Sequence, residues 1–165
     1  MEFLANQAVF HTPTVTRLMD LALEEDLGRG DVTAASLRSA GPARGTIVAR
    51  QELVLCGLPL LRALVQRSAM PLEVVGLIPE GSRVAAGDGV ARLDGDAGAI
   101  LLLERTALNF MMRMSAVATL TRSFVDRVGD KTRIVDTRKT LPGWRALDKY
   151  AVAVGGGFNH RHDLG

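Results

Sequence analysis

The feature that most constrains this chain is a long apolar segment from Gly98 to Val128. Its apolar residues recur at helical spacing on more than one face, which predicts a long and well buried helix. Charged side chains interrupt it, among them Glu104, Arg105, Arg113 and Arg122. Because no uncharged run approaches the ~20 residues of a membrane-spanning helix, we expect a soluble protein that does not bind membranes. The helix is either continuous or broken near Ser115.

Shorter patterns on both sides of this segment predict the remaining elements. Periodic apolar residues indicate helices, and short apolar runs between glycine-rich turns indicate strands. In chain order we expect a helix that starts at Thr12, a strand over 46–55, a helix over 59–68, a strand over 72–78, two short extended pieces over 79–96, a strand over 133–136 and a helix over 144–152.

This order of elements predicts an α+β protein with two parts. Residues 1–103 would form a small α/β sandwich domain. Residues 104–165 would supply a linking helix and the first βα elements of an incomplete α/β barrel of the TIM type. One strand and one helix cannot cover a parallel strand on both faces. We therefore expect a larger barrel to begin here and the chain to be truncated.

The charges are unevenly distributed between these two parts. Residues 1–103 carry nine Lys and Arg against twelve Asp and Glu, net −3, whereas residues 104–165 carry eleven against six, net +5. The second part is therefore expected to face an acidic partner, either nucleic acid or a phosphorylated or carboxylated metabolite. Aromatic residues make up only 4% of the chain and no nucleic-acid recognition motif is present, so we expect no nucleic-acid partner.

The chain has one cysteine, Cys56. It cannot form an internal disulfide, and no histidine or cluster of cations lies beside it in the sequence, so an inert buried thiol is expected. A single cysteine fits a reducing compartment. Because the first ten residues also lack the pattern of a signal peptide, we expect a cytoplasmic protein.

The first candidate binding motif is "DTRKT", residues 136–140, which follows a predicted strand. Ligands of α/β folds bind at the carboxyl ends of strands. Arg138 offers a planar fork that matches a carboxylate, and Lys139 offers a compact positive charge. A solvated turn is the structural alternative, with about equal weight on these residues alone.

The second motif is "GGGFNHR", residues 155–161. Consecutive glycines allow backbone N–H groups to approach an anion closely, and His160 and Arg161 would add a titratable donor and a second fork. Taken alone, the triple glycine is better explained as a tight turn beside a strand. Its proximity to "DTRKT" favours a binding site.

Arg105 lies inside the long apolar helix and needs an anionic partner, because a buried unpaired guanidinium is too costly. That partner is either a carboxylate of the same chain, such as Glu104, or a group across an interface. We expect no metal ligands in this chain, because no array of Cys, His and carboxylates has the required spacing.

Several motifs together resemble quinolinate phosphoribosyltransferase, the carboxylating nicotinate-nucleotide pyrophosphorylase. They are "EDLGRGDVT", "IPEGSRVAAGD", "ERTALNF", "SAVATLTR", "DTRKTLPGWRALDKYAV" and "GGGFNHR". The resemblance covers nearly the whole chain from Leu18 onward. It implies a small α/β sandwich followed by an incomplete α/β barrel, in a homodimer or larger assembly.

The resemblance also implies a reaction and a site. Quinolinate and phosphoribosyl pyrophosphate would give nicotinate mononucleotide, pyrophosphate and carbon dioxide, with Mg²⁺ bound by ligands beyond Gly165. This is the de novo route to NAD. Arg138 and Arg161 would hold the two quinolinate carboxylates, Lys139 and His160 would be the catalytic residues of the same pocket, and Arg105 would reach the site of the neighbouring subunit.

Two alternatives remain open at this point. A molybdenum-transport relative shares the general pattern, but it carries Pro-His-Arg where this chain has residues 159–161 as Asn-His-Arg, which favours the quinolinate enzyme. The other alternative is a non-catalytic oligomeric fragment, because the phosphoribosyl half of the expected site is not in this sequence.

Overall fold

The computed structural model describes residues 7–27 and 41–160. Within them the elements are η2 (Gln7–His11), α1 (Pro13–Leu27), β1 (Pro42–Val48), β2 (Leu53–Val54), α3 (Leu58–Ser68), β3 (Leu72–Gly76), β4 (Arg83–Val84), β5 (Gly89–Asp96), α4 (Ala97–Val128), η3 (Gly129–Lys131) and α5 (Arg145–Val154). The expected mixture of helices and strands is confirmed.

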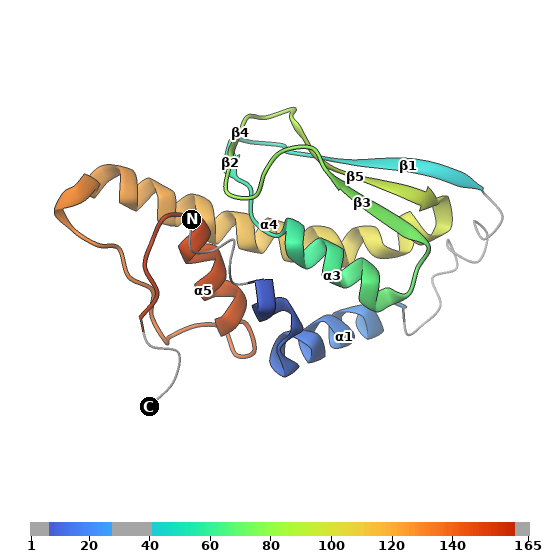
Figure 1. Cartoon of the computed structure of the whole chain (residues 1–165), viewed down its shortest axis with the longest axis horizontal. Helices are drawn as coiled ribbons and strands as arrows, with labels where there is room; N and C mark the ends of the chain where they lie inside the picture. Colours follow the sequence, from blue (N-terminus) through green and yellow to red (C-terminus); the bar gives the residue numbers. More distant parts are fainter. Residues whose placement is uncertain (1–6, 28–40, 161–165) are drawn as a thin grey trace.

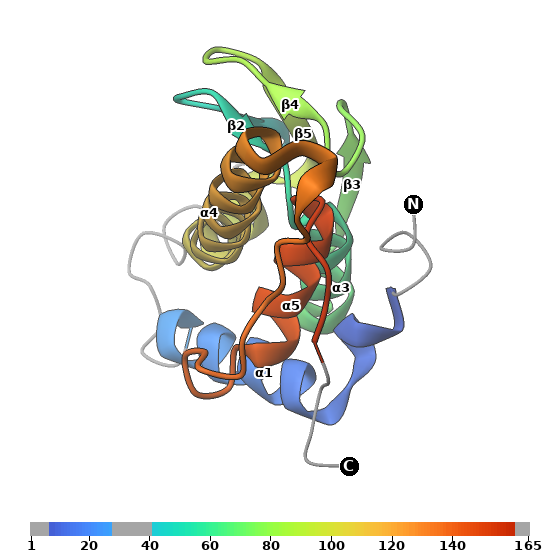
Figure 2. The ribbon, with the colours of Figure 1, turned by 90° about the vertical axis from the view of Figure 1, so that its left-hand side faces the viewer.

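An antiparallel sheet in the order β1-β5-β3 covers one side of the helices α3 and α4 (Figure 1). Pro42 is opposite Asp96 and Leu72 is opposite Gly95, so β5 is the central strand. A second pair, β2 and β4, is also antiparallel. Helix α1 lies on the far side from the sheet, as Figures 1 and 2 both show.

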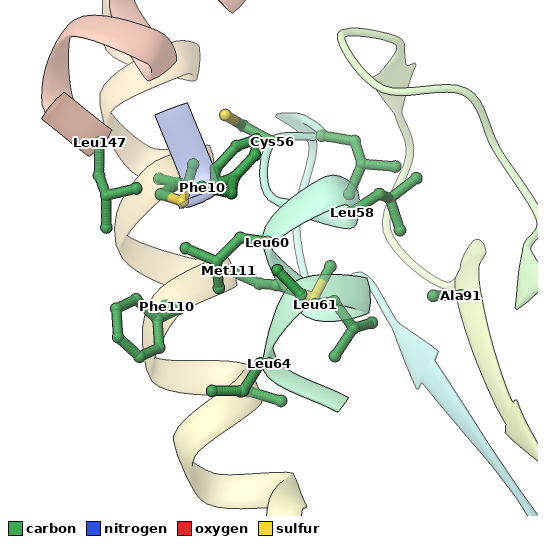
Figure 3. Packing of buried hydrophobic residues seen from close by; sticks show 14 of the residues in the cluster. Phe10, Cys56, Leu58, Leu60, Leu61, Leu64, Ala91, Phe110, Met111 and Leu147 are labelled. Atoms are coloured by element: carbon green, nitrogen blue, oxygen red, sulfur yellow. The ribbon is translucent and has the colours of Figure 1, made fainter. Parts of the chain in front are cut away.

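Side chains from all these layers form one hydrophobic core. Leu60 and Leu64 of α3 lie beside Phe110 and Met111 of α4 (Figure 3), and all four are buried. Phe10 of η2 meets the ring of Tyr150 of α5 edge to face at 4.8 Å between centroids. The same core thus connects the sandwich to α5.

Helix α4 is continuous, so the possible break near Ser115 does not occur. The Ser115 hydroxyl donates to the Cys56 carbonyl at 3.1 Å and accepts from the Cys56 N–H at 3.0 Å. Asp96 caps the start of the helix by accepting the Ala99 N–H at 3.0 Å. A serine that bonds to a neighbouring segment leaves the helix intact.

Helix α4 is less buried than its apolar pattern predicted. Four large apolar side chains of this helix are exposed: Leu101, Met112, Leu120 and Phe124. Within the described ranges, no helix combines the length and the hydropathy needed to cross a membrane.

Two strand predictions also need correction. The strand expected over 46–55 is two strands, because the β1 register shifts between Ile47 and Val48 and the chain then bends before it pairs with β4. The strand expected over 133–136 is a single parallel bridge between Val135 and Phe158. The helix expected over 144–152 is present as α5, two residues longer at its end.

Candidate functional site

The candidate site begins where the segment that precedes α5 in the sequence pairs in parallel with the segment that follows it (Figure 2). The Asp136 N–H donates to the Phe158 carbonyl at 3.0 Å, and the Phe158 N–H donates to the Ile134 carbonyl at 2.8 Å. This bridge brings the start of the "DTRKT" loop next to His160, 24 residues further along the chain. The structure therefore places the end of the second motif beside the start of the first.

A buried ion pair, which the sequence prediction missed, joins the two segments. The Lys149 ammonium of α5 lies 2.7 Å from both carboxylate oxygens of Asp136. The two side chains are 1% and 4% exposed. The sequence did hold an indication of this burial, since Lys149 lies between Leu147 and Tyr150 in an amphipathic helix, and both of these residues are buried. A lysine at such a position requires an anionic partner.

The expected cations of the "DTRKT" loop differ in burial. Arg138 is half-buried, its Nε is buried without a hydrogen-bond partner, and its guanidinium forms no ion pair within the described residues. Lys139 is exposed, and its N–H donates to the Thr137 hydroxyl at 3.2 Å. A partly desolvated guanidinium without a carboxylate partner is suited to bind an anion.

The position of His160 is defined by its backbone. Its N–H donates to Asp136 Oδ1 at 2.9 Å, and its carbonyl accepts from Lys149 Nζ at 3.0 Å, while the residue itself is exposed. The predicted second fork, Arg161, lies outside the described residues, so the convergence of Arg138 and Arg161 on one ligand stays a prediction.

The prediction that the glycine N–H groups bind an anion is wrong. All three already donate to carbonyls of α5: Gly155 to Ala151, Gly156 to Ala153 and Gly157 to Val152. The structural alternative, a tight turn, is the observed one.

The glycines are required by packing and backbone conformation. A Cβ on Gly155 would lie 2.5 Å from the Ala118 carbonyl oxygen of α4, and one on Gly157 would lie 2.7 Å from a Val152 methyl group. Gly156 has φ +89°, in the left-handed region. The glycine run lets the end of α5 touch α4.

Arg105 of α4 forms an ion pair with a carboxylate of the same chain. Its Nη1 lies 3.6 Å from Asp26 Oδ1 at the end of α1, and its side chain is 75% exposed. Asp26 also accepts the Thr106 hydroxyl at 2.5 Å. In the single chain the partner of Arg105 is therefore Asp26 and not Glu104, and a role in a neighbouring subunit stays a prediction. A small pocket around Arg105 is lined by residues of α1 and α4 only.

The carboxyl group with a perturbed pKa in the protein core is Glu80, in the loop before β4. It accepts the N–H groups of Gly57 and Leu58 at 2.7 and 3.0 Å, at the start of α3, and the Tyr150 hydroxyl at 3.2 Å. Burial raises the pKa of Glu80 despite these hydrogen bonds. Burial and the nearby Glu80 raise the pKa of Cys56. The expected burial of this thiol is confirmed.

An apolar groove of about 960 Å³ lies between β1 and α4, away from the cationic loop. Ile47, Ile100, Leu108 and Met111 line it, and no residue of the "DTRKT" loop does. Residues 7–27 and 41–160 contain no group of three His, Cys, Asp or Glu side chains that would hold a metal ion. The described residues therefore do not fit a magnesium site, and we derive no chemical step from this ion.

The fold and the loop define a protein of mixed helices and strands with a cationic loop directly after a parallel bridge. Two family models match the chain: the N-terminal domain of quinolinate phosphoribosyl transferase over residues 31–115 and the C-terminal domain over residues 117–165. The chain belongs to the quinolinate phosphoribosyl transferase family, as the motifs indicated.

Similar proteins agree with this assignment. A probable nicotinate-nucleotide pyrophosphorylase [carboxylating] of Synechocystis sp. is 42% identical over 143 residues, 86% of this chain and 48% of that protein. The nicotinate-nucleotide pyrophosphorylase [carboxylating] of Mycobacterium leprae is 41% identical over 149 residues, which are 87% of this chain and 52% of that protein. The structure of the nicotinate-nucleotide pyrophosphorylase from Francisella tularensis superimposes with a TM-score of 0.85 at 38% identity, over 92% of this chain and 55% of that one.

These comparisons confirm the expected fold class, a sandwich followed by the start of an α/β barrel, with no closed barrel in the described residues. The chain spans about half the length of the curated relatives it matches. Their names favour the quinolinate enzyme over the molybdenum-transport relative. The expected domain boundary between residues 103 and 104 lies inside the continuous helix α4 and stays a prediction.

Proposed function

We propose that this chain contributes the quinolinate-binding part of an enzyme that transfers a phosphoribosyl group to quinolinate with loss of carbon dioxide. Membership of the family supports the reaction class. The observation that carries the assignment to this site is the half-buried Arg138, unpaired within the described residues, beside a segment that ends in His160. Phosphoribosyl pyrophosphate is the proposed second substrate, and the product enters NAD biosynthesis.

The proposed chemistry needs orientation and charge compensation more than a nucleophilic side chain. The pyridine nitrogen attacks C1 of the ribose, the bond from C1 to the pyrophosphate oxygen breaks, and pyrophosphate leaves. The bond from C2 of the ring to its carboxylate then breaks, carbon dioxide departs, and the electron pair stays on C2 beside the cationic nitrogen. A proton completes nicotinate mononucleotide.

Each cation has a proposed role in these steps. Arg138 and Arg161 orient the two carboxylates, and Lys139 and His160 line the same pocket as catalytic residues. Positioned cations offset the repulsion between a dianion and the phosphates, and they hold the reacting atoms together. Mg²⁺ is proposed only as a companion of phosphoribosyl pyrophosphate, with no ligand assigned in this chain.

We also propose a homodimer or larger homo-oligomer, formed through the groove between β1 and α4. The groove and the pocket around Arg105 share Leu101, Glu104, Leu108 and Met112. A second subunit seated in the groove would therefore lie next to Arg105, which is the position needed for this side chain to enter the neighbouring site. A cytoplasmic location is proposed because the single cysteine is buried and unpaired.

The test uses quinolinate labelled in its 2-carboxylate and the complete product of the gene that encodes this sequence. We expect release of labelled carbon dioxide that requires phosphoribosyl pyrophosphate. Binding of quinolinate, measured by calorimetry, should be lost in Arg138→Ala and unchanged in Arg145→Ala, a control on α5. No release by the folded protein, or normal quinolinate affinity of Arg138→Ala, would reject the proposal.

A further inference from the structure

The buried pair of Asp136 and Lys149 has every hydrogen-bonding position occupied. The Lys149 ammonium has three protons, and they go to both Asp136 oxygens and to the His160 carbonyl. Asp136 also accepts the His160 N–H. With its amide nitrogen facing the acceptors, Asn159 donates to Asp136 Oδ2 at 2.8 Å and to the Lys149 carbonyl at 2.9 Å.

The hydrogen bonds of this network extend the contact between the two parallel segments from Phe158 to His160. Up to His160, where the described part of the chain ends, the two parallel segments share backbone hydrogen bonds only at Ile134, Asp136 and Phe158. Beyond Phe158, side chains take over, because the N–H and the carbonyl of His160 are both bonded to the ion pair. A fully satisfied buried network is rigid, and loss of one member leaves a buried charge unpaired.

The residues held in this way are those that flank the candidate site. Asp136 is two residues before Arg138, and His160 directly precedes Arg161 in the sequence. The pair therefore sets the separation of the two loop starts, although the side chains of Lys149 and Asp136 are too buried to bind a ligand.

We propose that Asp136 and Lys149 are positioning residues, which hold the segment that ends in His160 against the "DTRKT" loop so that a planar dicarboxylate meets both at once. This inference rests on the proposed function for the identity of the ligand. The pair acts through the placement of other residues and does not contact the substrate.

The test compares Asp136→Asn with Asp148→Asn in the full chain. Asp148 is the neighbouring carboxylate on α5, and it is paired with Arg113 of α4 at 3.1 Å, outside the network. The readouts are the amide hydrogen exchange of His160, followed by NMR without ligand, and the Kd for quinolinate from calorimetry.

In Asp136→Asn we expect His160 to exchange roughly 10-fold faster, the equivalent of one hydrogen bond. Phe158, bonded to a backbone carbonyl, should change little. The Kd for quinolinate should rise on the order of 100-fold, the effect of a misplacement of about 1 Å. Asp148→Asn should change neither quantity.

The positioning role also predicts coupling between sites. Because Asp136 acts through residues such as Arg138, the rise in Kd in Asp136→Asn/Arg138→Lys, where the lysine keeps a positive charge and a measurable affinity, should be smaller than the product of the two single effects. Three results would each overturn the inference. They are a rise in Kd of the double variant equal to the product of the two single rises, an unchanged Kd in a folded Asp136→Asn, and an equal loss of quinolinate affinity in Asp148→Asn.

Two further outcomes are separable. If the unaltered chain does not bind quinolinate, the proposed function fails, and the exchange rate of His160 still decides whether the pair positions that segment. If Asp136→Asn does not fold, Asn159→Ala removes only two donations from the network. We then expect the same changes at smaller size, and their absence would overturn the inference.

Discussion

Substitution of Gly155 by alanine tests the packing that positions the candidate site. Gly155 follows α5 with an ordinary φ of −67°, so an alanine there is not strained by its backbone. Its Cβ would lie 2.5 Å from the Ala118 carbonyl oxygen and 2.7 Å from Thr121 Cβ, both in α4. Because the first contact is with main-chain atoms of a helix, the two helices must separate.

The expected size follows from a matched comparison with Gly143→Ala. Gly143 has φ +83° and no atom within 4 Å of a Cβ, so this variant carries backbone strain without a clash. Left-handed strain costs about 1 kcal/mol, and overpacking against an immovable neighbour costs about 3 kcal/mol. Both substitutions lower the conformational entropy of the unfolded chain by the same amount, so this contribution cancels and a difference of about 2 kcal/mol remains.

Urea unfolding followed by circular dichroism measures this difference. With a slope of roughly 2 kcal/mol per molar urea, the midpoint of Gly155→Ala should be about 1 M below that of Gly143→Ala. If Gly155→Ala is as stable as Gly143→Ala or more so, the close contact between α5 and α4 does not explain the glycine run.

Three further predictions concern other parts of the molecule. Because the pKa of Glu80 is raised in the folded state, its linked stability is present at acid pH and lost as the pH rises through the raised pKa. The free energy of unfolding should therefore fall with pH relative to that of Glu80→Gln, and parallel urea curves across pH would contradict this. Met112→Asp, in the exposed groove, should shift the protein to monomers in analytical ultracentrifugation, with Arg127→Asp as an exposed control on the same helix. Arg105→Ala should change the stability by less than ~0.5 kcal/mol in urea unfolding, because an exposed ion pair contributes little; a larger loss would show that the arginine serves the fold of one subunit.

The helices could be predicted from the sequence to within a few residues, because each buries a periodic apolar face. The short strands could not. Whether residues 46–55 form one strand depends on where the pairing with β5 ends and the pairing with β4 begins, and those partners lie between 29 and 46 residues further along the chain. The glycine run could not be given its role for a similar reason, since Gly155 and Gly156 pack against α4, which lies some 30 residues earlier in the chain.

The candidate site was predictable in part. Arg138, Lys139 and His160 belong to chemically distinctive motifs, and the structure brings the "DTRKT" loop and His160 together. Asp136 and Lys149 were missed because a lysine in a helix is most often solvated. Their interaction depends on the parallel bridge, which holds the Asp136 carboxylate against Lys149 of α5.

The sequence alone determined the fold class, the family and the cationic character of the second part, because these follow from periodicity, motif order and the count of charges. Only the tertiary structure decided which of those cations form ion pairs. Lys149 pairs with Asp136 and Arg105 pairs with Asp26, whereas Arg138 is unpaired among the described residues. The physical reason is that an ion pair depends on distances of about 3 Å between atoms, and such distances are set by packing between segments that are remote in the chain.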